Sequence, residues 1–280
     1  MRLVVTGAGG GLARAFLAQA PEHHQIHAFT HAELDVGDHA AVLQTIPPLH
    51  PDFILNFAAR TQVDACEADP ALAMRDNALG AHHAALAARM CGAVLLHVST
   101  DYVFDGTKGA SYDELDTPNP LSVYGRTKLA GEVFARNVLP EHFVVRTGFV
   151  FGAGDDYASQ ALERLRHGQS AGGIRDRTGS PTFVRHLAAR LLPLLLTGRF
   201  GTYHLAGAQP ACWFEVRERA RAIGGLSGTV EPQEAASLGL VAARPENSSL
   251  ASAFLEHVGI EPFPPLDDAV AEWLASTSAG

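Results

Sequence analysis

The 280-residue sequence is poor in cysteine and has no long apolar run. Its three cysteines form no Cys-x-x-Cys motif and lie far apart, at Cys66, Cys91 and Cys212. This spacing argues against a disulfide framework or a zinc knuckle and favours a reducing, cytoplasmic location. The longest apolar stretch, near 191–196, is interrupted by Pro193 and is far shorter than the about 20 residues of a membrane span. The first residues run straight into a glycine loop, so we expect neither a signal peptide nor a membrane partner.

Basic residues are also scarce: 21 Lys and Arg stand against 30 Asp and Glu, a formal net charge of −9. This balance argues against nucleic-acid binding but allows an anionic small molecule, because local basic groups govern a single cleft. Apolar residues make up 47% of the chain, enough for a sizeable core. The 14 histidines show no clear metal-ligand spacing, so we predict no metal site.

Short β-rich runs alternate with longer helical stretches over the first two thirds of the chain. We predict strands at 2–6, 25–29, 53–55, 93–98 and 143–145, and helices at 12–20, 40–46, 70–91 and 122–137. Alternation of this kind predicts a doubly wound parallel sheet with helices on both faces. The continuous apolar strands agree with a sheet that is covered on both sides. We therefore predict an α/β, Rossmann-type fold, with a dinucleotide-binding core at 1–150.

The pattern weakens after residue 150. Helices are predicted at 157–167, 183–196, 214–223 and 265–275, with a short strand at 201–205. We interpret 151–280 as a smaller C-terminal lobe for the substrate, with some segments returning to the core.

A glycine loop follows the first predicted strand, with the pattern Gly7-x-x-Gly10-x-x-Ala13. Glycines at such a turn let the backbone approach a pyrophosphate, and the following helix offers its N–H groups to the phosphate. The second strand leads into Thr30-His31, without the acid that would favour NAD by binding the adenosine ribose. The choice between NADH and NADPH therefore stays open.

A candidate catalytic set lies downstream of this loop. Thr100 ends the fourth predicted strand, and Tyr124 and Lys128 are spaced to share one face of a helix. A free tyrosine has a pKa of about 10, and a nearby lysine cation should lower it. Tyr124 can then donate a proton to a carbonyl oxygen that Thr100 also hydrogen-bonds, while Lys128 reaches the nicotinamide ribose. Asn77 is expected to relay protons to Lys128 through a water molecule.

Several longer stretches carry a family resemblance. They are TGAGGGLA (6–13), PDFILNFAARTQVDACEADP (51–70), DNA (76–78), STDYVFDG (99–106), LSVYGRTKLAGE (121–132), VVRTGFVFG (144–152), DRTGSPTFVRHLA (176–188) and RPENSSL (244–250). With them the chain resembles extended short-chain dehydrogenase/reductases, most closely the dTDP-4-dehydrorhamnose reductase family. The resemblance implies reduction of the C4 ketone of a nucleotide-linked 4-keto-6-deoxyhexose by NADPH or NADH, a step of deoxysugar biosynthesis.

The resemblance also implies roles for individual residues. Tyr124 would be the proton donor, Lys128 the cofactor-binding lysine, and Thr100 and Asp101 would touch the sugar. Besides Gly7 of the motif, Tyr124 and Lys128, the expected cofactor-binding residues are Gly10, Gly11, Leu12, Asp35, Val36, Ala58, Ala59 and Arg60.

The chain departs from the family pattern in its second half. The usual Ser-Trp after the fifth strand is Gly148-Phe149, so Phe149 keeps an aromatic face toward the sugar but lacks the indole N–H. Arg177 replaces a usual glutamine and is a candidate contact for the substrate diphosphate. The exact sugar, the base and the product stereochemistry stay open, as does oligomeric state, with a homodimer possible.

Two other functions compete with reduction. A noncatalytic NAD(P)-binding regulatory subunit, similar to the β subunit of methionine adenosyltransferase, would have lost the tyrosine or the lysine, and neither is lost here. An epimerase or dehydratase is the other alternative, and a dehydratase would carry an acid–base pair after Thr100, where Asp101 is followed by Tyr102.

Overall fold

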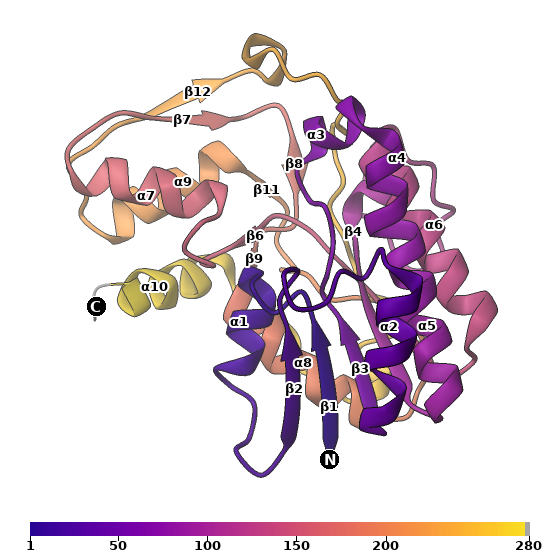
Figure 1. Ribbon diagram of the computed structural model, residues 1–280. Helices are drawn as coiled ribbons and strands as arrows, with labels where there is room; N and C mark the ends of the chain where they lie inside the picture. The colour runs from indigo at the N-terminus through magenta and orange to yellow at the C-terminus, as the bar shows by residue number, and fades with distance from the viewer. Residues whose placement is uncertain (278–280) are drawn as a thin grey trace.

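Six parallel strands form the central sheet of the computed structural model, which describes residues 1–277 (Figure 1). The strands are β1 (Arg2–Thr6), β2 (Gln25–Phe29), β3 (Phe53–Asn56), β4 (Val94–Thr100), β5 (His142–Thr147) and β10 (Gly201–His204), in the order β10-β5-β4-β3-β1-β2. The strand order reverses between β1 and β3, the place at which ligands bind in open α/β sheets.

Helices cover both faces of this sheet, as Figure 1 shows. One face packs against α2 (His39–Thr45), α5 (Gly80–Cys91) and α6 (Val123–Val138), and the other against α1 (Gly11–Leu17) and α8 (Val184–Leu196). Successive side chains of β1 point to opposite faces of the sheet. Val4 packs in the core under α2, α5 and α6, and Leu3 and Val5 pack in the core under α1 and α8. The predicted doubly wound α/β fold is confirmed.

The segment predicted as one helix over 70–91 is divided in three. It comprises α4 (Pro70–Ala73), a π-helical stretch η2 (Met74–Leu79) and α5. The wider π-turn brings the side chain of Asn77 to a buried position, where it hydrogen-bonds the backbone of Arg60. A π-turn inside a helix is often found at a functional site. The π-turn does not change the spacing of apolar residues in the sequence, and for this reason the sequence predicts an uninterrupted helix.

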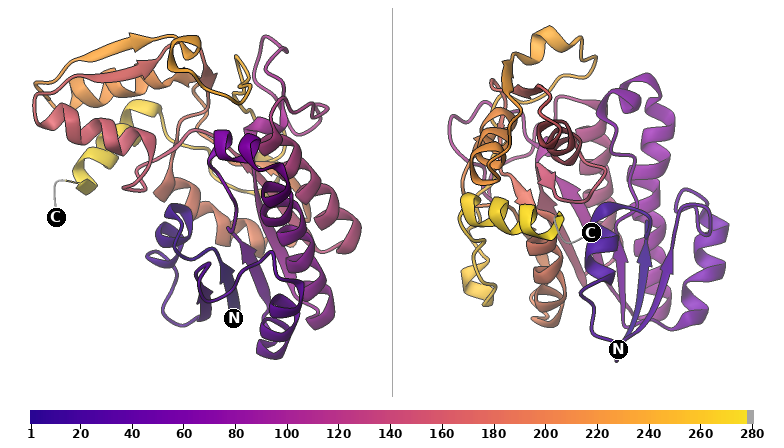
Figure 2. Two further views of the ribbon diagram at one scale, coloured as in Figure 1. Left: turned by 45° about the horizontal axis from the view of Figure 1, so that its top comes forward. Right: turned by 90° about the vertical axis from the view of Figure 1, so that its left-hand side faces the viewer.

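The second half of the chain forms a smaller lobe above the carboxyl ends of the strands (Figure 2). Its helices are α7 (Tyr157–Arg166), α9 (Trp213–Ile223) and α10 (Leu266–Thr277), close to the predicted ranges. Three two-stranded sheets were not predicted: β6 (Val150–Phe151) with β9 (Thr182–Phe183), β8 (Thr178–Gly179) with β11 (Ala211–Cys212), and β7 (Ala171–Ile174) with β12 (Val230–Gln233). Such short strands carry little periodicity.

Part of the second half returns to the first. Strand β10 pairs with β5 in the main sheet, and α8 packs on α1. The division into 1–150 and 151–280 stays a prediction.

The remaining short elements are α3 (Val63–Ala68), η1 (Pro47–Leu49), η3 (Asp101–Val103), η4 (Ala235–Leu238) and η5 (Glu256–Val258). Within residues 1–277, no helix combines the length and apolar character needed to cross a membrane.

Candidate active site

The glycine loop lies at the carboxyl ends of β1 and β3. Gly7 has a φ of +70°, and a Cβ atom at this position would lie 2.6 Å from the backbone nitrogen of Ala58. Gly10 is the N-cap of α1 and donates its N–H to the Gly7 carbonyl at 2.9 Å. Only glycine fits at position 7, because both the conformation and the close approach to β3 exclude a side chain. The loop thus directs the start of α1 toward the space above the sheet.

A cavity of about 330 Å³ opens beside this loop. Six of the predicted cofactor-binding residues line it: Gly7, Gly10, Val36, Ala58, Ala59 and Arg60. Its volume is in the range of small-molecule sites. Cavity and glycine cradle together fit a dinucleotide, whose phosphates would lie against the N–H groups of the loop.

The other predicted cofactor residues lie around this cavity and have structural partners. A Cβ at Gly11 would come 2.3 Å from the Cβ of Ala153, so this glycine also permits close packing against the second lobe. Leu12 packs into the apolar core. Asp35 accepts hydrogen bonds from Arg75 and from the Gly37 N–H, each at 2.8 Å.

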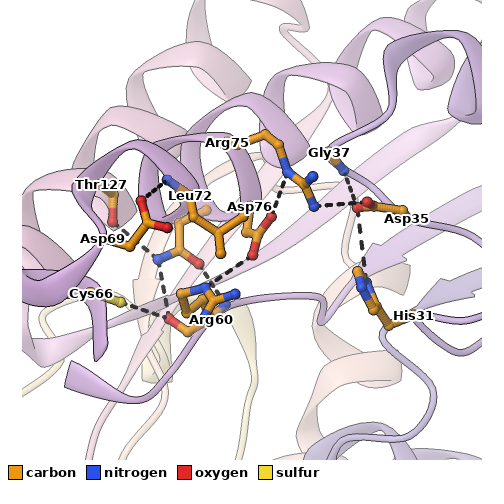
Figure 3. A network of polar contacts seen from close by, with 11 residues as sticks. His31, Asp35, Gly37, Arg60, Cys66, Asp69, Leu72, Arg75, Asp76 and Thr127 are labelled. Atoms are coloured by element: carbon orange, nitrogen blue, oxygen red, sulfur yellow. Dashed lines mark hydrogen bonds and ion pairs between the residues drawn. The ribbon is translucent and has the colours of Figure 1, made fainter. Parts of the chain in front are cut away.

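A network of ion pairs fixes the adenosine end of the predicted cofactor site (Figure 3). Arg75 bridges Asp35 at 2.8 Å and Asp76 at 2.9 Å, and Arg60 pairs with Asp76 at 3.2 Å. The ring of His31 lies 3.9 Å from Asp35. The two arginines and the two aspartates balance one another in charge, which holds Arg60 at the cavity wall.

Asn77 makes three hydrogen bonds with protein groups, and its water-mediated relay to Lys128 stays a prediction. Its amide accepts from the Arg60 N–H at 2.8 Å and donates to the Arg60 carbonyl at 3.2 Å and to Thr127 at 3.1 Å. All these partners are protein groups, so Asn77 fixes the backbone of the loop that follows β3.

Tyr124 and Lys128 lie one turn apart on α6, which packs against the end of β4. Ser122 caps this helix by accepting the N–H of Gly125. A Cβ at Gly125 would lie 2.1 Å from the carbonyl oxygen of Tyr102, so this glycine allows the first turn to press against the segment after β4. The ammonium of Lys128 is buried and donates to the Val98 carbonyl at 2.6 Å.

The protonation of this pair differs from the sequence-based expectation. Burial raises the pKa of Tyr124, and the nearby carboxyl of Asp101 acts in the same direction. Burial lowers the pKa of Lys128 to about 8, while Glu132 acts in the opposite direction. Desolvation therefore exceeds the influence that we expected from the lysine, and the Tyr124 phenol keeps its proton at neutral pH. A protonated phenol is the form that a proton donor requires.

A buried ion pair supports α6 from behind. The carboxylate of Glu132 is fully buried, with Arg146 at 2.7 Å, Arg136 at 3.1 Å and the Ser99 hydroxyl at 2.6 Å. Because Ser99 precedes Thr100, this cluster ties α6, β4 and β5 together next to the candidate catalytic set. The sequence analysis missed Glu132, although it lies in the quoted stretch LSVYGRTKLAGE.

Asp101 lies behind Thr100. Its side chain is buried and accepts the Thr100 hydroxyl at 3.0 Å and the hydroxyl of Ser248. Ser248 comes from the quoted RPENSSL stretch, to which the sequence analysis gave no role. The predicted contact between Asp101 and the sugar stays a prediction.

An aromatic stack borders the second lobe. Phe149 has a φ of +46°, and its ring lies parallel to that of Trp213, with 4.9 Å between centroids. Tyr157 meets Trp213 edge-on at 5.6 Å. A non-glycine residue with positive φ is under strain and is often part of a binding site. Trp213, one of two tryptophans in the chain, was not singled out in the sequence analysis.

Arg177 and Arg244 lie near the phenol of Tyr102. Burial raises the pKa of this phenol, and the charges of the two arginines act in the opposite direction. Arg177 donates to the carboxylate and the carbonyl of Asp176, and its buried Nε has no hydrogen-bond partner among residues 1–277. Arg244 forms an ion pair with Asp64 at 2.9 Å, which joins the second lobe to α3. The part of the chain that the structure describes contains no group of three His, Cys, Asp or Glu side chains that could hold a metal ion.

Comparisons with known proteins agree with this geometry. A family model, the RmlD substrate binding domain, matches residues 1–279. A dTDP-4-dehydrorhamnose reductase of Mycobacterium tuberculosis is 38% identical over 285 residues, covering 98% of this chain and 93% of the relative. A reductase of the same name from Streptomyces griseus is 36% identical, covering 93% and 89%. The crystal structure of dTDP-4-dehydrorhamnose reductase from Bacillus anthracis in complex with NADP superposes with a TM-score of 0.94 at 30% identity, covering 98% and 99%.

Proposed function

The chain belongs to the RmlD substrate binding domain family, and on that basis we propose that it reduces the keto group of a nucleotide-linked sugar with NAD(P)H. The substrate class is a nucleotide-linked 4-keto-6-deoxyhexose, reduced at C4 as in dTDP-4-dehydrorhamnose. The observation that carries this function is the arrangement of Thr100, Tyr124 and Lys128 at the end of β4, together with the glycine cradle and its cavity at the ends of β1 and β3 in the same sheet.

When bound, the nicotinamide cofactor supplies a hydride to the ketone carbon. Tyr124 donates its proton to the ketone oxygen as negative charge develops there, and its raised pKa keeps this proton available at neutral pH. Thr100 lies beside the phenol and orients it. Lys128 is held by the Val98 carbonyl and lies within the same buried patch, in position to bind the cofactor ribose.

The cofactor would lie across the β1 and β3 ends. Gly7, Gly10, Gly11 and Leu12 would meet the phosphates, and Asp35 and Val36 the adenosine. Ala58, Ala59 and Arg60 would follow its length, a role supported by their position in the cavity wall.

The substrate would extend from Tyr124 toward the second lobe. Phe149 would offer its aromatic face to the sugar, and Arg177 would bind the diphosphate. The free Nε of Arg177 and the strained backbone of Phe149 support these assignments.

We also propose a cytoplasmic homodimer. Free cysteines at positions 66, 91 and 212 support the reducing location. The exposed apolar side chains of Leu196 and Phe200, near the end of α8, support a contact between two copies. Light scattering of the purified chain tests the dimer.

The decisive experiment follows NADPH and NADH oxidation with dTDP-4-dehydrorhamnose for the wild type and Tyr124→Phe. We expect Tyr124→Phe to lower kcat by roughly 100-fold or more while cofactor affinity stays within about twofold, because only the proton donor is removed. Cofactor binding without ketone reduction by the wild type would favour the regulatory-subunit alternative. Loss of cofactor binding in Tyr124→Phe would contradict the assigned role of this residue.

A further inference from the structure

The carboxyl of Asp101 is enclosed by the catalytic set and the second lobe. Only 2% of the residue is exposed. Thr100 donates its hydroxyl proton to Oδ1 at 3.0 Å, and Ser248 donates to Oδ2. Among residues 1–277, no lysine, arginine or histidine forms an ion pair with it. Two hydroxyl groups therefore take the place of the cation that a buried carboxylate usually has.

Gly148 provides the space for this arrangement. A Cβ atom at position 148 would lie 2.5 Å from the carboxyl carbon of Asp101 and 2.7 and 2.8 Å from its oxygens. A serine, the residue that the family resemblance leads us to expect there, would displace the carboxyl. The departure at position 148 and the position of Asp101 are thus two parts of one local structure.

Hydrogen-bond donors and acceptors can be counted around Thr100. A hydroxyl has one proton and two acceptor lone pairs. The proton is given to Asp101, and one lone pair accepts the N–H of Tyr102 at 3.2 Å. The neighbouring phenol of Tyr124 is left with the second lone pair, so Thr100 is an acceptor toward Tyr124 while Asp101 is ionised.

Protonation of Asp101 would change this pattern. A neutral carboxyl is a weaker acceptor than a carboxylate and can itself donate to the Thr100 oxygen. The Thr100 proton would then be released toward the ketone oxygen of the substrate. Thr100 and Tyr124 would both donate to that oxygen as its negative charge develops.

We propose that Asp101 is a positioning residue that sets the direction of the Thr100 hydroxyl, and that Ser248 couples this setting to the second lobe. The inference rests on the proposed function, because it acts through Thr100 and Tyr124. Thr100 accepts from Tyr124 when Asp101 is ionised and donates to the ketone oxygen when Asp101 is protonated.

The surroundings place this switch in an accessible pH range. Burial raises the pKa of Asp101 to about 6, and the hydrogen bonds from Ser248 and Thr100 act against it. The titratable neighbours are the phenols of Tyr102 and Tyr124, whose pKa values burial raises. Around those two phenols lie Arg177, Arg244 and Cys66, and burial raises the pKa of the Cys66 thiol.

The test measures kcat and KM for dTDP-4-dehydrorhamnose with saturating NADPH between pH 5 and 8. For the wild type we expect kcat to rise as the pH falls through about 6. Asp101→Asn keeps the size of the side chain but cannot titrate, so this rise should be lost. Ser248→Ala removes a hydrogen bond that favours the ionised form, so the rise should move upward by roughly half to one pH unit.

Ser249→Ala is the matched control, because Ser249 follows Ser248 in the chain and its buried hydroxyl bonds Asn247 and Ser111 instead of Asp101. Its pH profile should match that of the wild type. Thermal unfolding of each variant checks that it folds, and Ser248→Ala preserves the test if Asp101→Asn does not fold. The role of Asp101 would be overturned if the rise in kcat stayed at the same pH in Ser248→Ala, or if Asp101→Asn retained this rise. Absence of ketone reduction by the wild type at every pH would instead count against the proposed function.

Discussion

Gly7→Ala probes the glycine cradle in which we propose that the cofactor binds. The added methyl group must be held at a φ of +70°, which costs about 1–2 kcal/mol for a residue with a Cβ. It would also lie 2.6 Å from the Ala58 nitrogen, and overlap with backbone in a packed region costs about 1–3 kcal/mol more. Together we expect a loss of about 2–5 kcal/mol in the free energy of unfolding of the cofactor-free protein.

Urea denaturation of the cofactor-free protein measures this loss, and Gly9→Ala is the matched control. A Cβ at Gly9 meets no atom within 4 Å, so its free energy of unfolding should stay within about 0.5 kcal/mol of the wild type. Equal losses in the two variants, or a loss below about 1 kcal/mol in Gly7→Ala, would refute the steric argument. If the loop relieves the strain by moving away from β3, the affinity for NADPH should fall. The Kd rises tenfold for each 1.4 kcal/mol of binding free energy that is lost.

Two further predictions concern the support of α6 and the second lobe. In a urea titration, Glu132→Gln should lower the free energy of unfolding by about 3–5 kcal/mol, because it leaves Arg146 buried without its charge partner. Glu163→Gln removes the charge from an exposed ion pair and should lower it by less than about 0.5 kcal/mol. Arg146 and the Ser99 hydroxyl hold the pKa of Glu132 below its usual 4.5. The ionised Glu132 therefore stabilises the fold fully above pH 4.5, and this stabilisation is lost as the pH falls through the lower pKa of the folded state. A stability difference between wild type and Glu132→Gln that stays unchanged down to pH 2 would contradict this. Arg177→Ala should raise the KM for the nucleotide sugar by roughly tenfold and leave the KM for NADPH unchanged. Arg219→Ala, which removes an ion pair with Asp267 of α10, should change neither KM value. An unchanged KM for the sugar in Arg177→Ala would remove this residue from the site.

The sequence by itself determined the α/β architecture and the position of the helix that carries Tyr124 and Lys128. Apolar strands alternating with helices have few ways to bury both faces of a sheet, and the spacing of Tyr124 and Lys128 fixes their common face on any helix. The glycine loop was equally readable, because its glycines stand between an apolar strand and a helix, where a tight turn favours residues without a side chain. These features are local or nearly so.

Only the tertiary structure decided the electrostatics of the site. The direction of the pKa shift of Tyr124 depends on how far burial outweighs its neighbours, and no spacing reveals that balance. The contact between Ser248 and Asp101 joins residues 147 positions apart, and the stack of Phe149 on Trp213 joins two elements that pair only in the folded lobe. Local patterns fix which elements form, whereas desolvation and long-range contacts arise only when those elements pack together.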